Sequence, residues 1–302
     1  MKWKTRLLLR SVLPLLPFQK SLRSLKRRFT SINEENTDGV LRFICIMTRQ
    51  LQADGFVFDG KTALELGTGW EPQIPLILKL AGCGRVMTVD LHRLLDITSC
   101  RRTVEFLKKR SDKIITELGI ESDAFNHYLN GIAFDTVSTF LESAAIDYLS
   151  PCDARRLSQP GNSVDLIVSN NVLEHIPPQI IEEIFREFHR VLRPGGMMAH
   201  TIDNCDHWTY GDRSISCVNF LQFEDDEWKR LQYNPIDFQN RLRHFEYLKM
   251  FADAGFTVTH DLSLFEESLL AALAEMSICE RYRSVPHKEL AIVISRIIAE
   301  KR

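Results

Sequence analysis

The segment KTALELGTGWEP, residues 61–72, joins an apolar run to a glycine-containing turn and decides the fold. The run at 61–66 predicts a buried strand. Gly67 and Gly69 allow a tight turn and let a ligand approach main-chain N–H groups. Asp90 ends the next apolar run, and an acid at the tip of a second strand is placed to hold a ribose diol. The segment therefore predicts a strand, turn and helix that bind a nucleoside-containing ligand.

Outward from this turn, short apolar runs alternate with helical stretches. Strands are expected at 61–66, 85–89, 145–149, 164–169, 197–202, 256–264 and 290–297. Helices are expected at 39–53, 75–81, 94–118, 178–192 and 245–254. Nearly continuous apolar strands are buried on both faces, and alternation of strands with helices builds a parallel sheet. The predicted fold is α/β: a doubly wound, mostly parallel, Rossmann-like sheet of seven strands with helices on both faces.

The details of the turn distinguish two cofactors. A dinucleotide fingerprint G-x-G-x-x-G would place its third glycine at position 72, where the chain has Pro72, and proline hinders close packing around a pyrophosphate. Glu65, two residues before the first glycine, would also oppose a pyrophosphate, yet it suits a ligand that carries an ammonium and a sulfonium. The turn therefore favours S-adenosylmethionine over a nicotinamide dinucleotide.

Five motifs carry a resemblance to a known family. They are ELGTG at 65–69, VD at 89–90, CDA at 152–154, SNNVLEHI at 169–176 and VLRPGG at 191–196. Their order and approximate spacing resemble the class I S-adenosylmethionine-dependent methyltransferases over residues 58–202. Trp70 departs from the usual third small residue of the turn.

The resemblance implies a set of cofactor contacts. The turn and Glu65 would face the methionine portion, and Asp90 would hold the ribose hydroxyls. Asp153 would meet the adenine edge, and Asn170 would lie beside the transferring methyl group. His175, in VLEHI, is expected to be structural. The cofactor-binding residues implied are Glu65, Gly67, Thr68, Gly69, Asp90, Leu91, Asp153, Ala154 and Asn170.

A polar cluster follows the expected strand at 197–202. It holds His200, Asp203, Asp206 and His207, and ligands of open α/β sheets bind beyond the carboxyl ends of strands. A hydroxyl acceptor must lose its proton, so a neutral histidine or a carboxylate is the useful neighbour. The catalytic candidates are His200 first, then His207, with Asp203. A solvated turn ranks second and a metal site third because the spacing matches no known metal motif, so no metal is predicted. The stretch H-x-I-D-x-x-D-H also resembles a group of bacterial methyltransferases.

The charge is unevenly distributed along the 302 residues. Residues 1–33 carry nine bases and no acid, which leaves 29 bases against 40 acids in the remainder. We expect residues 1–38 to form a basic arm or cap, and residues 39–302 a methyltransferase domain with an insertion at about 203–245. The arm is a solvated segment or cap, an amphipathic segment on an anionic membrane, or a transit peptide. The acidic body argues against a nucleic-acid partner.

Composition and motifs together give a ranked set of functions. Seven cysteines without a C-x-x-C pair, and no apolar run of membrane-spanning length, indicate a cytoplasmic protein. The leading prediction is an enzyme that methylates an O or N atom of a small molecule or glycan. A non-catalytic cofactor-binding or membrane-associated scaffold is the alternative. A nucleic-acid methyltransferase is third, because the fourth strand reads SNNV, unlike the N-P-P-Y-like signature that grips an extruded base.

Overall fold

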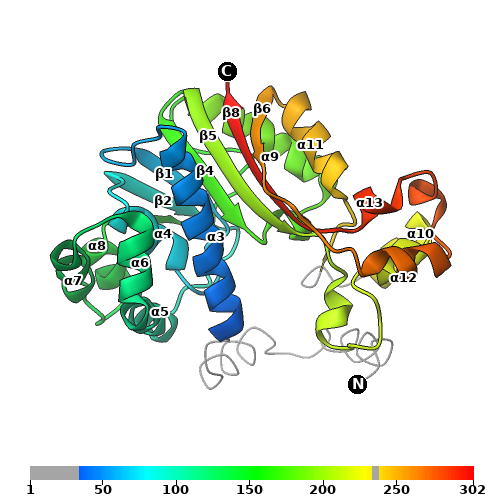
Figure 1. Cartoon of the computed structure of the whole chain (residues 1–302). Helices are drawn as coiled ribbons and strands as arrows, with labels where there is room; N and C mark the ends of the chain where they lie inside the picture. Colours follow the sequence, from blue (N-terminus) through cyan, green and yellow to red (C-terminus); the bar gives the residue numbers. More distant parts are fainter. Residues whose placement is uncertain (1–33, 233–237) are drawn as a thin grey trace.

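A computed structural model describes residues 34–232 and 238–302, and the sheet is its centre (Figure 1). Eight strands form one sheet in which the main path runs β3-β2-β1-β4-β5-β8-β6. Their bounds are β1 Thr62–Leu66, β2 Arg85–Val89, β3 Ile146–Leu149, β4 Val164–Asn170, β5 Leu192–Asp203, β6 Phe256–Asp261, β7 Leu264–Phe265 and β8 Ile292–Lys301. The predicted α/β class and all seven predicted strands are confirmed.

The first five strands are parallel, and β8 runs antiparallel between β5 and β6. The expected strand 256–264 is divided, because after β6 the Ser263 N–H donates to the Asp261 carboxylate in a turn. The two-residue β7 then pairs with β8 and becomes the eighth strand.

Because β1 to β5 are parallel, their carboxyl ends meet along one edge of the sheet.

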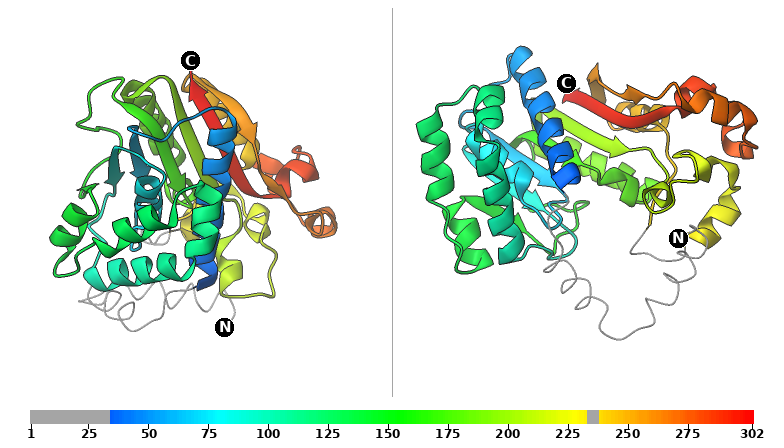
Figure 2. Two further views of the ribbon diagram at one scale, coloured as in Figure 1. Left: turned by 60° about the vertical axis from the view of Figure 1, so that its left-hand side comes forward. Right: turned by 60° about the horizontal axis from the view of Figure 1, so that its bottom comes forward.

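Helices cover both faces of the sheet, as Figures 1 and 2 show. On one face lie α3 Glu34–Ala53, α4 Gln73–Leu80, α5 Ile97–Lys109, α6 Ser111–Leu118, α7 Ser122–Asn130 and α8 Val137–Ser143. On the other face lie α9 Pro178–Val191 and α11 His244–Asp253. The helix expected at 94–118 is two helices that meet at Arg110, whose guanidinium binds Asp38 of α3 through two hydrogen bonds of 2.5 and 2.9 Å. That ion pair fixes the α5–α6 bend against α3.

A third hydrophobic cluster lies beyond one end of the sheet. It combines the expected insertion with the segment between β7 and β8, including α10 Asp225–Leu231, α12 Leu269–Glu275 and α13 His287–Leu290. Two buried arginines hold it together, and one of them, Arg243, also connects it to the sheet. Arg241 donates to the Phe220 and Phe223 carbonyls and to Asp225, and Arg243 donates to the carbonyls of Asn204, Leu290 and Ile292. The insertion is therefore packed against the body by its own core.

Of the basic arm expected at 1–38, residues 1–33 lie outside the described residues, and residues 34–38 belong to α3, which begins five residues before the helix expected at 39–53. Among the helices that the structure does describe, none is long and apolar enough to span a membrane.

The core under α9 generates a stability prediction. Phe185 is fully buried and its ring centroid lies 4.7 Å from that of Phe251 on α11. We expect Phe185→Ala to lower the free energy of unfolding by about 3–5 kcal/mol, since it removes an aromatic side chain and leaves a cavity. Phe265, which is 46% exposed on β7, is the matched control. For Phe265→Ala we expect a loss of about 0.5 kcal/mol or less in denaturant titration. Equal losses at the two positions would contradict the packing described.

Candidate active site at the carboxyl edge of the sheet

The glycine turn follows β1 and has the conformation that its sequence predicts. Gly67 and Gly69 have φ angles of +81° and +63°, which residues with a side chain rarely adopt. A Cβ at Gly67 would lie 2.6 Å from a methyl carbon of Val172, which follows β4. A Cβ at Gly69 would meet nothing within 4 Å. The turn is thus packed on one side against the segment after β4 and has space beside Gly69 for a ligand.

Asp90 fastens this turn to the end of β2. One carboxylate oxygen accepts the Gly69 N–H at 2.9 Å, and the other accepts the His92 N–H at 3.1 Å. Leu91, next to it, is 61% exposed, which is unusual for a leucine and provides an apolar surface beside the carboxylate. The glycine turn, the Asp90 carboxylate and the exposed Leu91 side chain therefore lie together where β1 and β2 end.

Glu65 lies beneath the turn and not in the cleft. Its side chain is 2% exposed and accepts a 2.6 Å hydrogen bond from Thr88; Thr68, also buried, contacts the Thr88 hydroxyl. Burial raises the pKa of Glu65 to about 7, although hydrogen bonds from Thr88 and Thr68 partly oppose that shift and Asp90 adds to it. The expectation that Glu65 itself faces the methionine portion does not fit this position. Glu65 instead supports the turn through Thr68.

The other residues of the expected cofactor site lie along the same edge. Asp153 follows β3 and forms a close ion pair with Arg155, which holds the pKa of Asp153 below its usual range against a smaller opposing effect of burial. Ala154 is buried in the cluster under α9 and α11. Asn170, half-buried, ends β4 and pairs with Thr201 of β5. These residues therefore lie where the strands end, but Asp153 already has a partner.

His200 is in the core, and the expectation that it points into the cleft is wrong. It is 1% exposed on the face of β5 that α9 and α11 cover, and its ring lies against Phe185, Phe188 and Phe251. Nδ1 bonds the Ser169 hydroxyl at 2.6 Å. Burial lowers the pKa of His200 to about 3, so the ring is neutral. The physical reason is strand periodicity: alternate residues of β5 face opposite layers, and His200 shares its face with Met198 and Ile202.

His207 and Asp203 do reach the edge. The His207 Nε2 lies 3.1 Å from an Asp203 carboxylate oxygen, and the Tyr210 hydroxyl donates to the same oxygen at 2.5 Å. Burial alone would raise the pKa of Asp203, but the hydrogen bonds from His207, Tyr210 and the Cys205 N–H hold it below its usual range. Asp206 is different, because it is buried and caps the short 3-10 helix η3, His207–Tyr210, through the Trp208 N–H.

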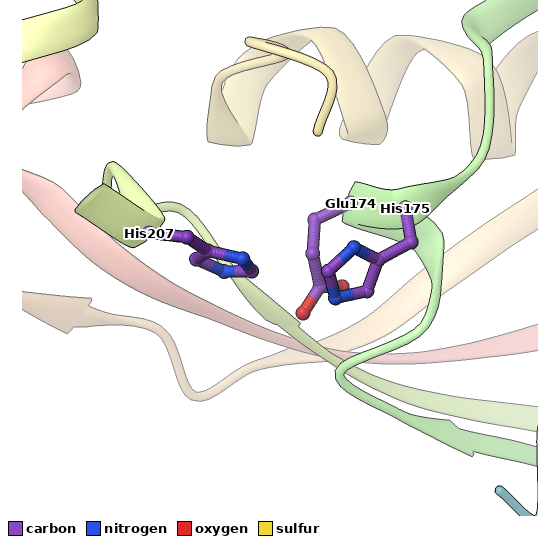
Figure 3. A group of neighbouring side chains, drawn as sticks. All are labelled: Glu174, His175 and His207. Carbon is purple, nitrogen blue, oxygen red and sulfur yellow. The ribbon is translucent and has the colours of Figure 1, made fainter. Parts of the chain in front are cut away.

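Sequence reasoning missed two members of this site, Glu174 and His175. Both belong to the short 3-10 helix η2, Leu173–His175, which follows β4. The ring centroids of His175 and His207 are 5.0 Å apart, and ligand atoms of Glu174, His175 and His207 lie within 4.8 Å of one another (Figure 3). The signal that could have found them is that β4 and β5 are neighbours in a parallel sheet, so the residues after each meet at one edge.

Glu174 is the most unusual group of the site. It is 1% exposed, and neither carboxylate oxygen has a hydrogen-bond partner among the described residues. Burial raises its pKa well above the usual range, and the Asp203 carboxylate adds to that effect more than nearby backbone N–H groups oppose it. A carboxylate in this position requires either a proton or a cation nearby.

Comparison with known proteins agrees with this geometry. A family model described as a methyltransferase domain matches residues 118–200, which include β4, η2 and most of β5. No curated protein sequence matches the chain.

Solved structures with a similar arrangement are distant in sequence. A S-adenosylmethionine-dependent methyltransferase from Mesorhizobium loti has 13% identity and a TM-score of 0.43, over 83% of this chain and 95% of that one. A magnesium protoporphyrin IX methyltransferase from Synechocystis PCC 6803 with bound S-adenosylhomocysteine has 11% identity and a TM-score of 0.49, over 94% of both chains. At such values no residue role transfers from them.

Two findings bear on the class of protein. Residues 118–200 match a methyltransferase domain, and that segment lies in a doubly wound α/β sheet whose first five strands are parallel. S-adenosylmethionine is the cofactor of methyltransferases with this fold, and the space beside Gly69, in the turn after β1, is open to a ligand.

The buried position of Glu65 generates a pH prediction. A carboxyl whose pKa is about 7 when folded and about 4.5 when unfolded stabilises the fold below pH 4.5, and the stabilisation is lost as pH rises to 7. Glu65→Gln removes this titration, so between pH 5 and pH 8 its stability should rise relative to the wild-type chain, by up to about 3 kcal/mol. Denaturant titration of both proteins at pH 5 and pH 8 measures this difference in the free energy of unfolding. If the difference is the same at both pH values, the pKa of Glu65 is not raised by folding and the prediction is wrong.

Proposed function

We propose that the protein transfers the methyl group of S-adenosylmethionine to an O or N atom of a small molecule or glycan. The observation that carries the proposal is the contact of the Gly67–Gly69 turn with Asp90, at the edge where Asn170, Asp203 and His207 also lie. A nucleoside-binding turn next to a histidine–carboxylate pair provides both halves of a methyl transfer. The matched methyltransferase domain supports the same activity.

The cofactor supplies an electrophilic methyl group bound to a sulfonium. In the transfer the S–CH₃ bond breaks, its electron pair stays on sulfur, and the acceptor atom forms the new bond and loses one proton. Asp90 would hold the ribose hydroxyls, and Leu91 would cover the nucleoside. Glu65 and Thr68 act as positioning residues, because they hold the turn from beneath. Asn170 would lie beside the methyl group, and His207, which contacts Asp203, would be on the acceptor side.

The adenine edge is assigned to the segment after β3. Asp153 and Ala154 follow that strand, which lies beside β2 in the sheet. The ion pair with Arg155 fixes the orientation of the Asp153 carboxylate. Adenine would therefore contact either a lone pair of that carboxylate not used by Arg155 or the backbone beside it.

The acceptor class rests on charge and on the insertion. The body of the chain is acidic, which disfavours a nucleic-acid acceptor. The insertion brings η3 and Tyr210 to the edge of the site, so it is the segment placed to select the acceptor. The alternative function, a non-catalytic scaffold, is supported only by the basic residues 1–33. We also propose, from the charge of that segment, that it contacts the surface of an anionic membrane.

Asp90→Ala tests the cofactor site. We expect binding of S-adenosylhomocysteine to weaken by about 1.5–3 kcal/mol for each charged hydrogen bond lost, as measured by calorimetry. Asp147→Ala, which removes an exposed carboxylate at β3, should leave the affinity unchanged. Nicotinamide dinucleotides should not bind the wild-type chain. Tight dinucleotide binding, or equal affinities of the two variants, would refute the assignment.

His207→Ala tests the acceptor side. With an acceptor found by screening phenols, amines and sugars against labelled cofactor, we expect turnover to fall about 10²- to 10⁴-fold while cofactor affinity is retained. His200→Asn keeps a polar side chain that can bond the Ser169 hydroxyl in the core. If this variant folds, it should retain the turnover of the wild-type chain. A loss of turnover in His200→Asn at unchanged stability, with none in His207→Ala, would reverse the assignment.

A further inference from the structure

Three side chains at the edge of the site converge from two separate segments. Glu174 and His175 come from η2 after β4, and His207 begins η3 after β5. Figure 3 shows the two imidazole rings and the carboxylate turned toward one another. Their ligand atoms lie within 4.8 Å of one another. Around a tetrahedral Zn²⁺ with bonds of about 2.0–2.1 Å, ligand atoms are about 3.4 Å apart, so closing the group requires shifts of about 1 Å.

Both histidines are oriented as metal-ligating histidines are. His175 Nδ1 lies 2.9 Å from the Phe238 carbonyl oxygen, and a carbonyl accepts only from a protonated nitrogen, so the lone pair is on Nε2. His207 Nε2 faces the Asp203 carboxylate at 3.1 Å, and donation there places the lone pair on Nδ1. A ring N–H donated to a carbonyl or a carboxylate is the usual outer contact of a histidine ligand.

Glu174 is the member of the group that most favours a cation. Its side chain is buried with both carboxylate oxygens unpartnered among the described residues, and it lies beside His175 and His207. Buried carboxylates that are not protonated are paired or bind metals. The two imidazole lone pairs beside Glu174 can bind a metal ion directly, whereas a substrate ammonium could only donate hydrogen bonds to them.

We propose that Glu174, His175 and His207 bind one divalent transition-metal ion of the zinc type, with Asp203 orienting His207. Two imidazoles and one carboxylate are a ligand set of catalytic zinc sites, which keep a further position open. His175 is exposed and His207 is half-buried, so the open position faces the side from which an acceptor enters.

A metal ion at this site would act on the acceptor of the proposed methyl transfer, so its role in catalysis rests on the proposed function. The binding of the ion itself does not depend on that function. A hydroxyl bound at the open position would have its pKa lowered by the ion and would release its proton to solvent before the methyl group arrives. His207 then acts as a ligand and not as a base. This would explain why two histidines, His175 of η2 and His207 of η3, lie together where one base would suffice.

The test uses the full chain, freed of metal by a chelator and titrated with Zn²⁺ and with Co²⁺. We expect one ion per chain by calorimetry and a Co²⁺ spectrum of nitrogen and oxygen ligands without a thiolate charge-transfer band. Asp203→Asn should lower the affinity about 10- to 100-fold, and His207→Ala or the isosteric Glu174→Gln by more. His127→Ala, an exposed histidine on α7, is the matched control and should bind as the wild-type chain does.

Binding of S-adenosylhomocysteine reports whether each variant is folded and separates the two proposals. Metal binding that depends on His207 in a chain that binds no S-adenosylhomocysteine supports the metal site and refutes the methyltransferase. No metal binding at millimolar Zn²⁺ by a chain that does bind S-adenosylhomocysteine overturns the metal site alone. Equal Zn²⁺ affinity in His207→Ala, Glu174→Gln and His127→Ala would also overturn it.

Discussion

The parallel pairing of β1, β4 and β5 is the constraint on which the rest of the molecule depends. Glu65 is in register with Val168, and Asn170 with Thr201. Because these strands point the same way and are covered on both faces, their backbone hydrogen bonds are satisfied within the sheet, and the polar residues that follow each strand are delivered to one edge. The cofactor turn and the histidine–carboxylate group are both products of that alignment.

The same alignment explains why two carboxylates of the site are buried. The Cβ position at Gly67 is filled by Val172, so the turn after β1 packs directly on the segment after β4, and this packing excludes water from the groups beneath and beside it. Glu65 and Glu174 both have a raised pKa because burial disfavours the ionised form. Their surroundings differ, since Glu65 accepts from Thr88 and Glu174 has neither oxygen satisfied within the described part of the chain. Glu65 supports the turn after β1, whereas Glu174 is the carboxylate of the proposed metal site.

The buried arginines decide where the insertion lies. The Arg243 guanidinium donates to the Asn204 carbonyl after β5 and to the Leu290 carbonyl before β8. The Arg241 guanidinium donates to a carbonyl within the insertion, that of Phe220. Such contacts satisfy carbonyls that would otherwise be buried without partners. They set the position of η3, and with it the positions of His207 and Tyr210 beside the strand edge.

The sequence by itself determined the fold class, the seven main strands and the glycine turn with Asp90. Those features depend on local periodicity, on the backbone freedom of glycine and on motif order, which are all readable along the chain. It did not predict the division at Arg110 or the short β7, because an ion pair to α3 and a turn at Asp261 produce them. For the candidate site, Asp90, Asn170, Asp203 and His207 lie at or just after the ends of strands, whereas Glu65 and His200 are buried, and the expected roles of the first four stay predictions. Only the tertiary structure decided which face of β5 His200 occupies and that Glu174 and His175 meet His207, because the sequence gives the spacing within a segment and the pairing of β4 with β5 sets the distance between segments.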